Sequence, residues 1–492
     1  MKVVTIMLNF LVYGAAAFVG GLLVFMLILL LIRPMLKLVT KHIANIILSD
    51  RYAENLWEMV TAMTRISPQY IVENSLRAET GGVIERPFGS PRNFLNFDGL
   101  VFSPAQLAVL PEHEDTQVDT TVTIGPKAKK PLKLDIPILL GAMGYGVGVS
   151  EKSKIAMAMG TAAAGTATNT GEGGFLQEER DHAKYLIMQY HAGKWGKNPE
   201  QWRQADAIEI HLGQGASAAA ASRIPPEYMQ GRARGVLGLK EGETAVLPSR
   251  LPGMNRGSDL KKIVQQLRNA TDGVPIGVKI VPGHLLEKDI EIALQAKVDF
   301  IAIDGAQAGT KGSPTILEDD FGLPTIYALC RAARYLKKRG KKDSVSLLIG
   351  GGFYNPGQCL KALALGADAV FIGTAAIWAM THTQVSKTLP FEPPTHLIFY
   401  TGKMKDEFDE QLAAKHLENF FRSFVEEMSI AALALGHKRL KDVTAADLAA
   451  LDEMTSLVTQ VPMAYEAPSK ETDNKKPAKL FHSLDLIRQR KE

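Results

Sequence analysis

From about residue 135 onward, short apolar runs alternate with alanine-rich stretches of helical character. The runs are continuously apolar, as expected of parallel strands that are buried on both faces. Each is followed by a helical stretch, which predicts an α/β protein with a closed (β/α)8 TIM barrel rather than an open doubly wound sheet. The expected strands lie within residues 136–143, 162–168, 185–190, 207–213, 275–281, 300–305, 346–352 and 369–375.

The same pattern divides the rest of the chain. The gap between the fourth and fifth strands holds an insertion at about 217–258, rich in proline, glycine and charge. Because barrel active sites form where strands end, it is a candidate lid, and a passive surface loop is the alternative. Thr444 is expected to cap a final helix. The divisions are a helical and turn-rich lead-in at 35–133, the barrel at 134–400, C-terminal helices at 401–465 and a solvated tail at 466–492.

The N-terminal apolar stretch has another character, because no charged residue lies between Val3 and Ile32. It is longer than the ~20 residues that a helix needs to cross a bilayer. Arg33 and further basic residues follow it, whereas a small-residue cleavage site would follow a signal peptide. The sequence predicts a transmembrane anchor at 1–34, and the positive-inside rule places the large C-terminal body in the cytoplasm of a single-pass cell-membrane protein. Residues 35–47 predict an amphipathic helix, at the membrane interface or packed on the barrel.

The composition of the chain limits the kinds of partner and metal site that can be expected. The chain has 492 residues, of which 46% are hydrophobic and 22% charged, with a formal net charge of +4. No basic stripe with interleaved aromatic residues is present, so nucleic acid is not an expected partner. Two cysteines, Cys330 and Cys359, are too few for a four-cysteine zinc site or a ferredoxin-type cluster. We therefore expect no metal, and two ordinary buried thiols in helices.

Two glycine clusters end the last two expected strands. They are Gly350–Gly352 and Gly373–Ala375. In barrels, the loops after the seventh and eighth strands commonly bind phosphate through backbone N–H groups and a helix N-terminus, and glycine permits close approach. Walker and Rossmann motifs are absent from the sequence. The clusters together predict a phosphate site.

Polar residues end three other strands. Lys279 lies in the apolar run PIGVKIV, where burial of a lysine is costly unless its charge is used. In a barrel mouth it can stabilise negative charge on a reduced flavin, and a lysine that reaches solvent is the alternative. Glu172, in a loop of glycine and polar residues, can accept a proton or bind an amine. His211 can act as an acid or bind a carboxylate, and Gln214 can read an amide edge.

These segments resemble a known family. GAMGYGVGVSEKSKIAMAMG, TATNTGEGG, IEIHLGQGAS, IGVKIV, GTKGSP, GGGFYNPG and GADAVFIGTA occur in this order. They are similar to the FMN-binding synthase domain of glutamate synthases, and the upstream segments FDGLVFSPAQL and TIGPKAKKPLKLDIPI resemble stand-alone, archaeal-type members. The resemblance covers about residues 90–460.

The resemblance implies FMN across the barrel mouth and hydride transfer at its N5 atom, by which 2-oxoglutarate and ammonia give L-glutamate in glutamate biosynthesis. Glu172, Lys279 and His211 would be catalytic. The substrate would contact Asn169, Glu172, His211, Gln214 and Ser217. The cofactor would contact Ala142, Met143, Thr168, Gln189, Lys279, Gly305, Gly351, Gly352, Gly373 and Thr374.

The chain also departs from that family. Lysines that help to bind a dicarboxylate are replaced by His211, Ser217 and Met188, and an arginine by Lys194. A histidine and an aspartate are lost from the segment IDGAQAGTKG, and the iron–sulfur cysteines are missing after the eighth strand. The substrate is thus left open. Without a cluster, a quinone or another membrane electron donor, and a separate amidotransferase subunit, become the expected partners.

Other functions remain as alternatives. An IMP dehydrogenase-like barrel requires a cysteine after the sixth strand, where AQAGTKGSP has none. A 2-hydroxy-acid oxidase-like barrel requires a His–Arg pair near the flavin, for which the sequence offers no clear position. A membrane-bound flavin-binding electron-transfer subunit or scaffold, without glutamate synthase activity, also fits the altered substrate positions.

Overall fold

The computed structural model describes residues 2–55 and 57–466, in two compact units, Met1–Ile84 and Glu85–Glu492. Of the tail expected at 466–492, all but Glu466 lies outside the described residues.

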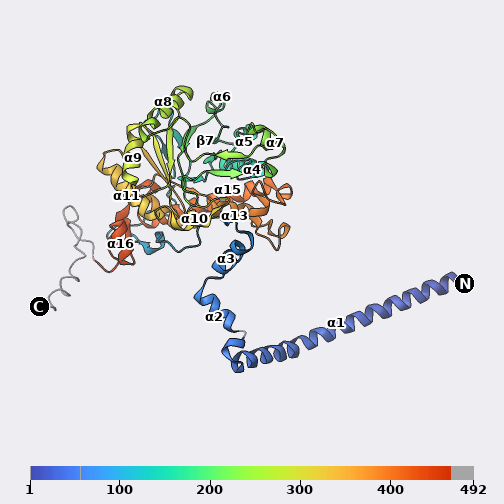
Figure 1. Ribbon diagram of the computed structural model, residues 1–492. Helices are drawn as coiled ribbons and strands as arrows, with labels where there is room; N and C mark the ends of the chain where they lie inside the picture. The colour runs from blue at the N-terminus through green and yellow to red at the C-terminus, as the bar shows by residue number, and fades with distance from the viewer. Residues whose placement is uncertain (1, 56, 467–492) are drawn as a thin grey trace. The chain divides into compact units, whose positions relative to one another are not determined.

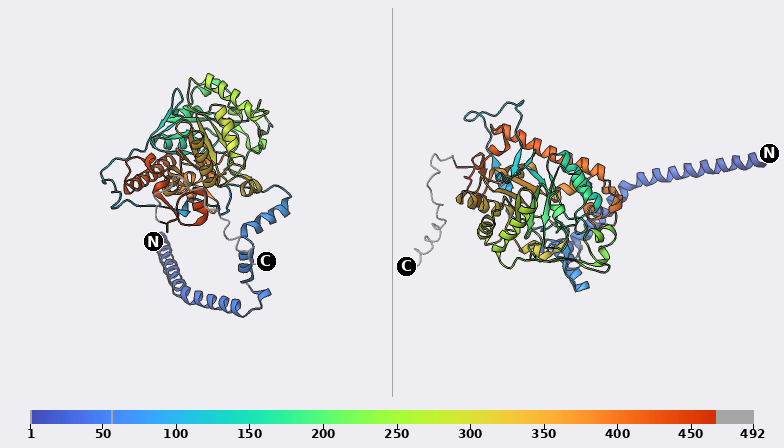
Figure 2. Two further views of the ribbon diagram at one scale, coloured as in Figure 1. Left: turned by 90° about the vertical axis from the view of Figure 1, so that its left-hand side faces the viewer. Right: turned by 90° about the horizontal axis from the view of Figure 1, so that it is seen from above.

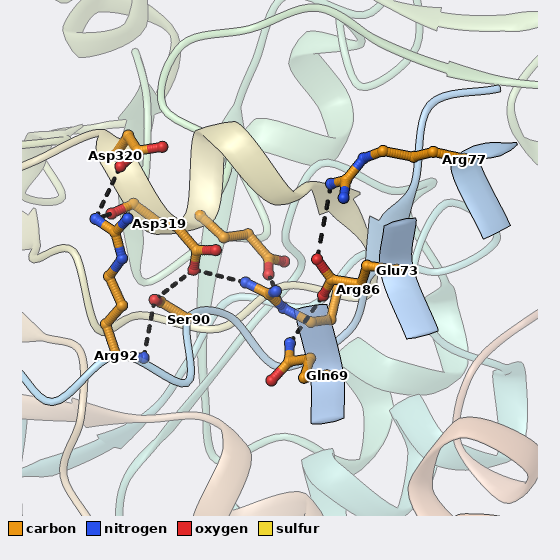
Figure 3. Close-up of polar contacts among 9 residues, drawn as sticks. Gln69, Glu73, Arg77, Arg86, Ser90, Arg92, Asp319 and Asp320 are labelled. Atoms are coloured by element: carbon orange, nitrogen blue, oxygen red, sulfur yellow. Dashed lines mark hydrogen bonds and ion pairs between the residues drawn. The ribbon is translucent and has the colours of Figure 1, made fainter. Parts of the chain in front are cut away.

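The described part of the first unit contains helices joined by short turns. Helix α1 (Lys2–Ser49) is continuous through Pro34, so no break separates the expected anchor from the amphipathic stretch after it. Its portion Phe10–Ser49 is long and apolar enough to cross a membrane, and an 18-residue window within it has a mean hydropathy of 2.9. The short η1 (Tyr52–Glu54), α2 (Trp57–Arg65) and α3 (Pro68–Thr80) follow. Within α3, Glu73 accepts a hydrogen bond from Gln69 and pairs with Arg77 (Figure 3).

The second unit is a nearly closed parallel barrel, as predicted (Figure 1). The hydrogen-bonded order is β5-β15-β14-β12-β11-β8-β7-β6, and the end strands β5 and β6 lie next to each other. Each strand lies within or overlaps a predicted run. The strands are β5 (Ile138–Leu140), β6 (Ala167–Asn169), β7 (Tyr185–Tyr190), β8 (Ala207–His211), β11 (Ile276–Ile280), β12 (Phe300–Asp304), β14 (Ser346–Gly350) and β15 (Ala369–Ile372).

Helices surround the strands (Figures 1 and 2). Helix α4 approaches the C-terminal helix α15 so closely that a Cβ atom on Gly160 would lie 2.8 Å from the carbonyl oxygen of Ala414. The helices are α4 (Glu151–Ala163), α5 (Gln177–His182), α6 (Pro199–Trp202), α8 (Leu260–Ala270), α9 (Leu286–Gln295), α10 (Thr315–Asp320), α11 (Thr325–Lys338), α12 (Pro356–Ala364), α13 (Thr374–Thr381), α14 (Pro393–Leu397) and α15 (Glu410–Ala434). The 3-10 turn η2 (Phe97–Gly99) precedes these helices, and the turns η4 (Gly257–Asp259), η5 (Val385–Lys387) and η6 (Lys405–Glu407) lie between them.

Two apolar layers lie on the two faces of the strands, because successive side chains point to opposite sides. One layer fills the barrel, with Leu139, Ile187, Ala207, Phe300 and Leu348 among its members. The hairpin of β3 (Val122–Ile124) and β4 (Leu132–Leu134) joins this layer. The other strand residues pack outward against the helices. Strand alternation therefore decides which polar residues enter the barrel.

The part of the lead-in from Glu85 onward is attached to the barrel through strand pairing and ion pairs. Strand β1 (Glu85–Arg86) pairs with β13 (Ser313–Pro314), and β2 (Leu100–Phe102) pairs with β16 (Leu448–Ala450). Arg86 contacts Glu318 at 2.9 Å and Asp319 at 2.6 Å on α10, and Ser90 also donates to Asp319 (Figure 3). These contacts anchor the loop between β12 and α11.

Two expectations from the sequence concern the insertion after the fourth barrel strand and the helix after Thr444. The insertion forms a small ordered body, with β9 (Ser222–Ile224), η3 (Pro226–Tyr228), α7 (Gly231–Val236) and β10 (Ala245–Leu247), that packs on Val147 and Trp195. The prediction of a helix after Thr444 is wrong. Thr444 caps only a 3-10 turn, η8 (Ala445–Asp447), because the chain then pairs as β16 before α16 (Glu453–Thr459). The turn η7 (Leu440–Asp442) precedes it.

Candidate active site

A ring of polar side chains lies on the inner face of the strands at their C-terminal ends, above the apolar filling. Alternation from the inward residues Ile187, Ala207 and Phe300 brings the polar residues of β7, β8 and β12 inward, and alternation from Ala167 does the same for Asn169 on β6. Lys279 on β11 points to the same side, because its ammonium pairs with Asp304. We call this set the inner polar ring: Asn169, Gln189, Glu209, His211, Lys279 and Asp304. It lies at the end of the barrel where barrel enzymes carry their active sites.

Glu172 and His211 form an ion pair at the edge of this ring, with 3.0 Å between a carboxylate oxygen and Nδ1. Burial favours the neutral form of the imidazole, but the charge of Glu172 and its hydrogen bond outweigh burial and raise the pKa of His211. Burial also opposes ionisation of Glu172, and His211 overcomes it and lowers the pKa of Glu172. The pairing therefore favours a carboxylate beside an imidazolium.

The other ring nitrogen of His211 is the group with catalytic potential. Nε2 is buried and has no hydrogen-bond partner among the described residues. In an imidazolium this atom carries a proton, so His211 presents an unused donor. The indole N–H of Trp195 donates to the backbone carbonyl of Glu172 at 2.8 Å and so holds the backbone of Glu172 in place.

Lys279 and Asp304 form a second buried pair, 2.9 Å apart, on the neighbouring strands β11 and β12. Burial opposes the ammonium, but the nearby carboxylates of Asp304 and Glu209 outweigh burial and raise the pKa of Lys279. The Nζ atom also lies 5.4 Å from the centre of the Phe371 ring. The expectation that Lys279 is buried inside the barrel, rather than reaching solvent, is confirmed.

Glu209 orients two amides at the base of the ring. One of its oxygens accepts from Asn169 at 3.1 Å and from Gln189 at 2.8 Å. Since these bonds use the amide nitrogen of Gln189, its oxygen is left as a buried acceptor with no partner in the described chain. The site thus offers a preset acceptor for an N–H group.

A glycine-lined cradle lies beside the ring, at the ends of β14 and β15. Gly351 (φ 111°) and Gly352 (φ 74°) have backbone angles that favour glycine. Gly373 precedes α13, of which Thr374 is the first residue, and a Cβ atom there would meet nothing within 4 Å. Gly305, after β12, packs closely on Thr325 and on Gly215. Free backbone N–H groups at a helix N-terminus attract an anion.

A buried lysine outside the barrel fixes the neighbouring loops. Lys154 of α4 pairs with Glu179 at 2.7 Å and donates to the carbonyls of Met143 and Asn169. Met143 and Ala142, partly buried, form the loop after β5. Thr168 donates to Glu179 at 3.2 Å, so its side chain joins this outer cluster and not the inner polar ring. Alternation explains this, because Asn169 points inward and its neighbour must point outward.

Gln214 and Ser217 lie in one tight turn after β8. The Gln214 N–H donates to the Ala218 carbonyl, and Ala216 has a left-handed φ of 63°. Both side chains are partly exposed. They lie three and six residues after His211, on the loop that continues its strand.

Sequence reasoning missed Glu209 and Asp304. The signal that singled out Lys279, a charge in an apolar strand, is present in both AIEIHL and FIAIDG. It also missed His191, a buried imidazole whose pKa is lowered to about 3 by burial and by Lys197. The prediction for the cysteines is confirmed, because Cys330 and Cys359 are buried on α11 and α12.

The sequence of this chain is similar to those of known proteins. Residues 101–438 match the conserved region in glutamate synthase. The chain is 32% identical over 415 residues to a glutamate synthase large subunit-like protein of Rhizobium meliloti, which covers 80% of this chain and 93% of that protein. It is 30% identical over 384 residues to an archaeal-type glutamate synthase (NADPH) of a Thermotoga species, with 74% and 76% covered. A mutant flavocytochrome b2 with pyruvate bound has a TM-score of 0.46 and 16% identity, and covers 77% of this chain and 84% of its own.

The matches define the class of this barrel as a glutamate synthase-like oxidoreductase. The chain belongs to the glutamate synthase family.

Proposed function

We propose that this chain is an FMN-dependent oxidoreductase of the glutamate synthase type, which exchanges hydride between flavin N5 and an imino or 2-oxo acid. The reduction of 2-oxoglutarate with ammonia to L-glutamate is the first reaction to test. The observation that carries the proposal is the Glu172–His211 pair, with its unused Nε2 donor, on the same barrel rim as Lys279 and the glycine cradle.

The residues fit FMN on three counts. The free oxygen of Gln189 suits the N3–H group of a flavin, and Lys279 suits its N1–C2=O edge. The cradle of Gly351, Gly352, Gly373 and Thr374 suits a phosphate, since it combines glycine backbone with a helix N-terminus. Ala142 and Met143 would lie under the ring, and Gly305 beside it. Thr168 would support the cofactor only through its backbone.

When bound, FMN supplies hydride exchange at N5. The protein's own part is proton transfer and orientation. His211 would donate a proton from Nε2 to the substrate nitrogen or oxygen, while Glu172 holds the imidazolium in place. Asn169, Gln214 and Ser217 would bind the remaining polar groups of the substrate.

A charge added to the cradle tests the phosphate site. Gly373→Asp is expected to weaken FMN binding about tenfold or more, roughly 1.4 kcal/mol, because a carboxylate would enter the open space that faces the phosphate. Titration of the apoprotein with FMN, followed by quenching of flavin fluorescence, measures this. Gly373→Asn has the same shape without the charge and should bind more tightly than the aspartate. Equal affinity in the two variants would place the phosphate elsewhere.

Turnover identifies the substrate class. The dithionite-reduced holoprotein should be reoxidised anaerobically by a 2-oxo acid with ammonium, and 2-oxoglutarate should be compared with monocarboxylic 2-oxo acids. The comparison matters because His211 and Ser217 stand where the family resemblance implies lysines. For the same reason, an electron-transfer subunit or scaffold is the second candidate. Stoichiometric FMN with no reaction toward any such pair would favour it.

We further propose that α1 anchors the protein in the cell membrane, with the barrel in the cytoplasm and electrons supplied by a quinol or another membrane donor instead of an iron–sulfur cluster. The apolar stretch of Phe10–Ser49 supports the anchor. The two cysteines, both buried in helices, support the absence of a cluster.

Fractionation tests the anchor. The full chain should sediment with membranes and be released by detergent but not by high salt. Leu23→Asp with Leu27→Asp should move it toward the soluble fraction, since each charge costs about 2.5–3.5 kcal/mol at a helix centre. Leu107→Asp, an exposed leucine of the lead-in, is the matched control. Release of the unmodified chain by salt alone would contradict a spanning helix.

A further inference from the structure

Lys279 does not act alone at the rim of the barrel, because Asp304 forms an ion pair with it. The two side chains project inward from adjacent strands, and their charged atoms are 2.9 Å apart. Both are largely buried, so solvent screens the pair only weakly. The consequence developed below rests on the proposed binding of FMN.

The pairing changes what Lys279 can do for a flavin. A lone ammonium at the N1–C2=O edge stabilises the negative charge that develops there on reduction, and so raises the reduction potential. A carboxylate at 2.9 Å opposes most of that field. Glu209 adds to the opposition, since its charge acts on Lys279 and one of its buried oxygens has no partner within the described chain.

We propose that Asp304 offsets the charge of Lys279 and thereby holds bound FMN at a lower reduction potential than Lys279 alone would set. A lower potential makes the bound cofactor a stronger hydride donor. The pair therefore favours the reductive direction, from an imino acid to an amino acid. Asp304 is a positioning residue in this scheme, because it acts on the flavin through Lys279.

A purely structural role for Asp304, as the counter-ion that lets a lysine be buried, predicts something different. In that case its removal would weaken folding but leave the flavin's potential unchanged. The potential of the bound cofactor is thus the readout that separates the two roles. Lys279 should remain charged when Asp304 is neutralised, because Glu209 and Glu172 still favour its ammonium form.

The test is the reduction potential of FMN bound to the full-length holoprotein, in Asp304→Asn and in the unmodified chain. Asp304→Asn should shift the balance toward the reduced form about tenfold or more, equivalent to about 30 mV for a two-electron couple. Affinity for sulfite, which adds to flavin N5 and places negative charge on the same edge, should rise in parallel. Asp299→Asn is the matched control. Asp299 directly precedes β12, at the end of the strand opposite to Asp304, and pairs with Arg268 at 2.9 Å.

Each result decides the matter. A higher potential in Asp304→Asn, with no shift in Asp299→Asn, supports the proposal. An unchanged or lower potential in Asp304→Asn overturns it while the proposed function stands. If Asp304→Asn does not fold, Asp304→Ser and the sulfite affinity replace it, and the same directions apply. Failure of the unmodified chain to bind FMN would contradict both the proposed function and this inference.

Discussion

Glu172→Gln is expected to lower kcat by about 10²–10⁴-fold while FMN remains bound, because general acid–base groups contribute that much. The amide removes the charge that favours protonation of His211, so the buried imidazole would become neutral and would no longer be a cationic acid. Steady-state turnover and the flavin content of the purified variant measure the two effects separately.

The dependence of activity on pH should also change in a defined direction in this variant. A group with a raised pKa keeps its proton up to a higher pH, so activity that needs the His211 imidazolium should fall only as pH rises through a value above the ordinary 6.5. In Glu172→Gln the fall should move to lower pH. Glu178→Gln is the control, since Glu178 is a partly exposed acid paired with Arg232. An unshifted profile in Glu172→Gln would remove this pair from the proton-transfer step.

Lys279→Met is expected to lower the potential of bound FMN and to destabilise the fold by about 3–5 kcal/mol, because it leaves the carboxylate of Asp304 buried without its partner. Redox titration and denaturant unfolding of the purified chain measure the two effects. Potential and stability should fall together in this variant.

Two further variants check the assignment. Lys279→Met combined with Asp304→Leu should recover much of the lost stability, since removing both charges leaves neither unpaired. Lys184→Met breaks the exposed pair with Asp135 and should cost no more than about 1 kcal/mol. An unchanged potential in Lys279→Met would take Lys279 away from the flavin edge.

Much of the barrel could be predicted because its strands are continuously apolar. A run such as FIAIDG is typical of a strand buried on both faces, and all eight predicted runs became barrel strands. The same continuity hides which side of a strand faces inward. Thr168 and Asn169 are adjacent and equally polar, yet only Asn169 enters the barrel.

The pairing of charges could not be predicted, because it depends on the register of neighbouring strands. Lys279 is opposite His211 on β8 and Ala302 on β12, and this register brings Asp304 within reach of its ammonium. Likewise, the Thr444 cap was readable in the sequence. The strand that follows it was not, since β16 forms only by pairing with the distant β2.

The most direct test of the central claim is anaerobic mixing of the full-length, FMN-loaded and dithionite-reduced protein with 2-oxo acids and ammonium. The account predicts that the visible absorbance of oxidised flavin returns with at least one such pair, and that the matching amino acid forms in equal amount. It also predicts that Glu172→Gln slows this return. A stable reduced flavin with every pair, or a chain that binds no FMN, would contradict the account.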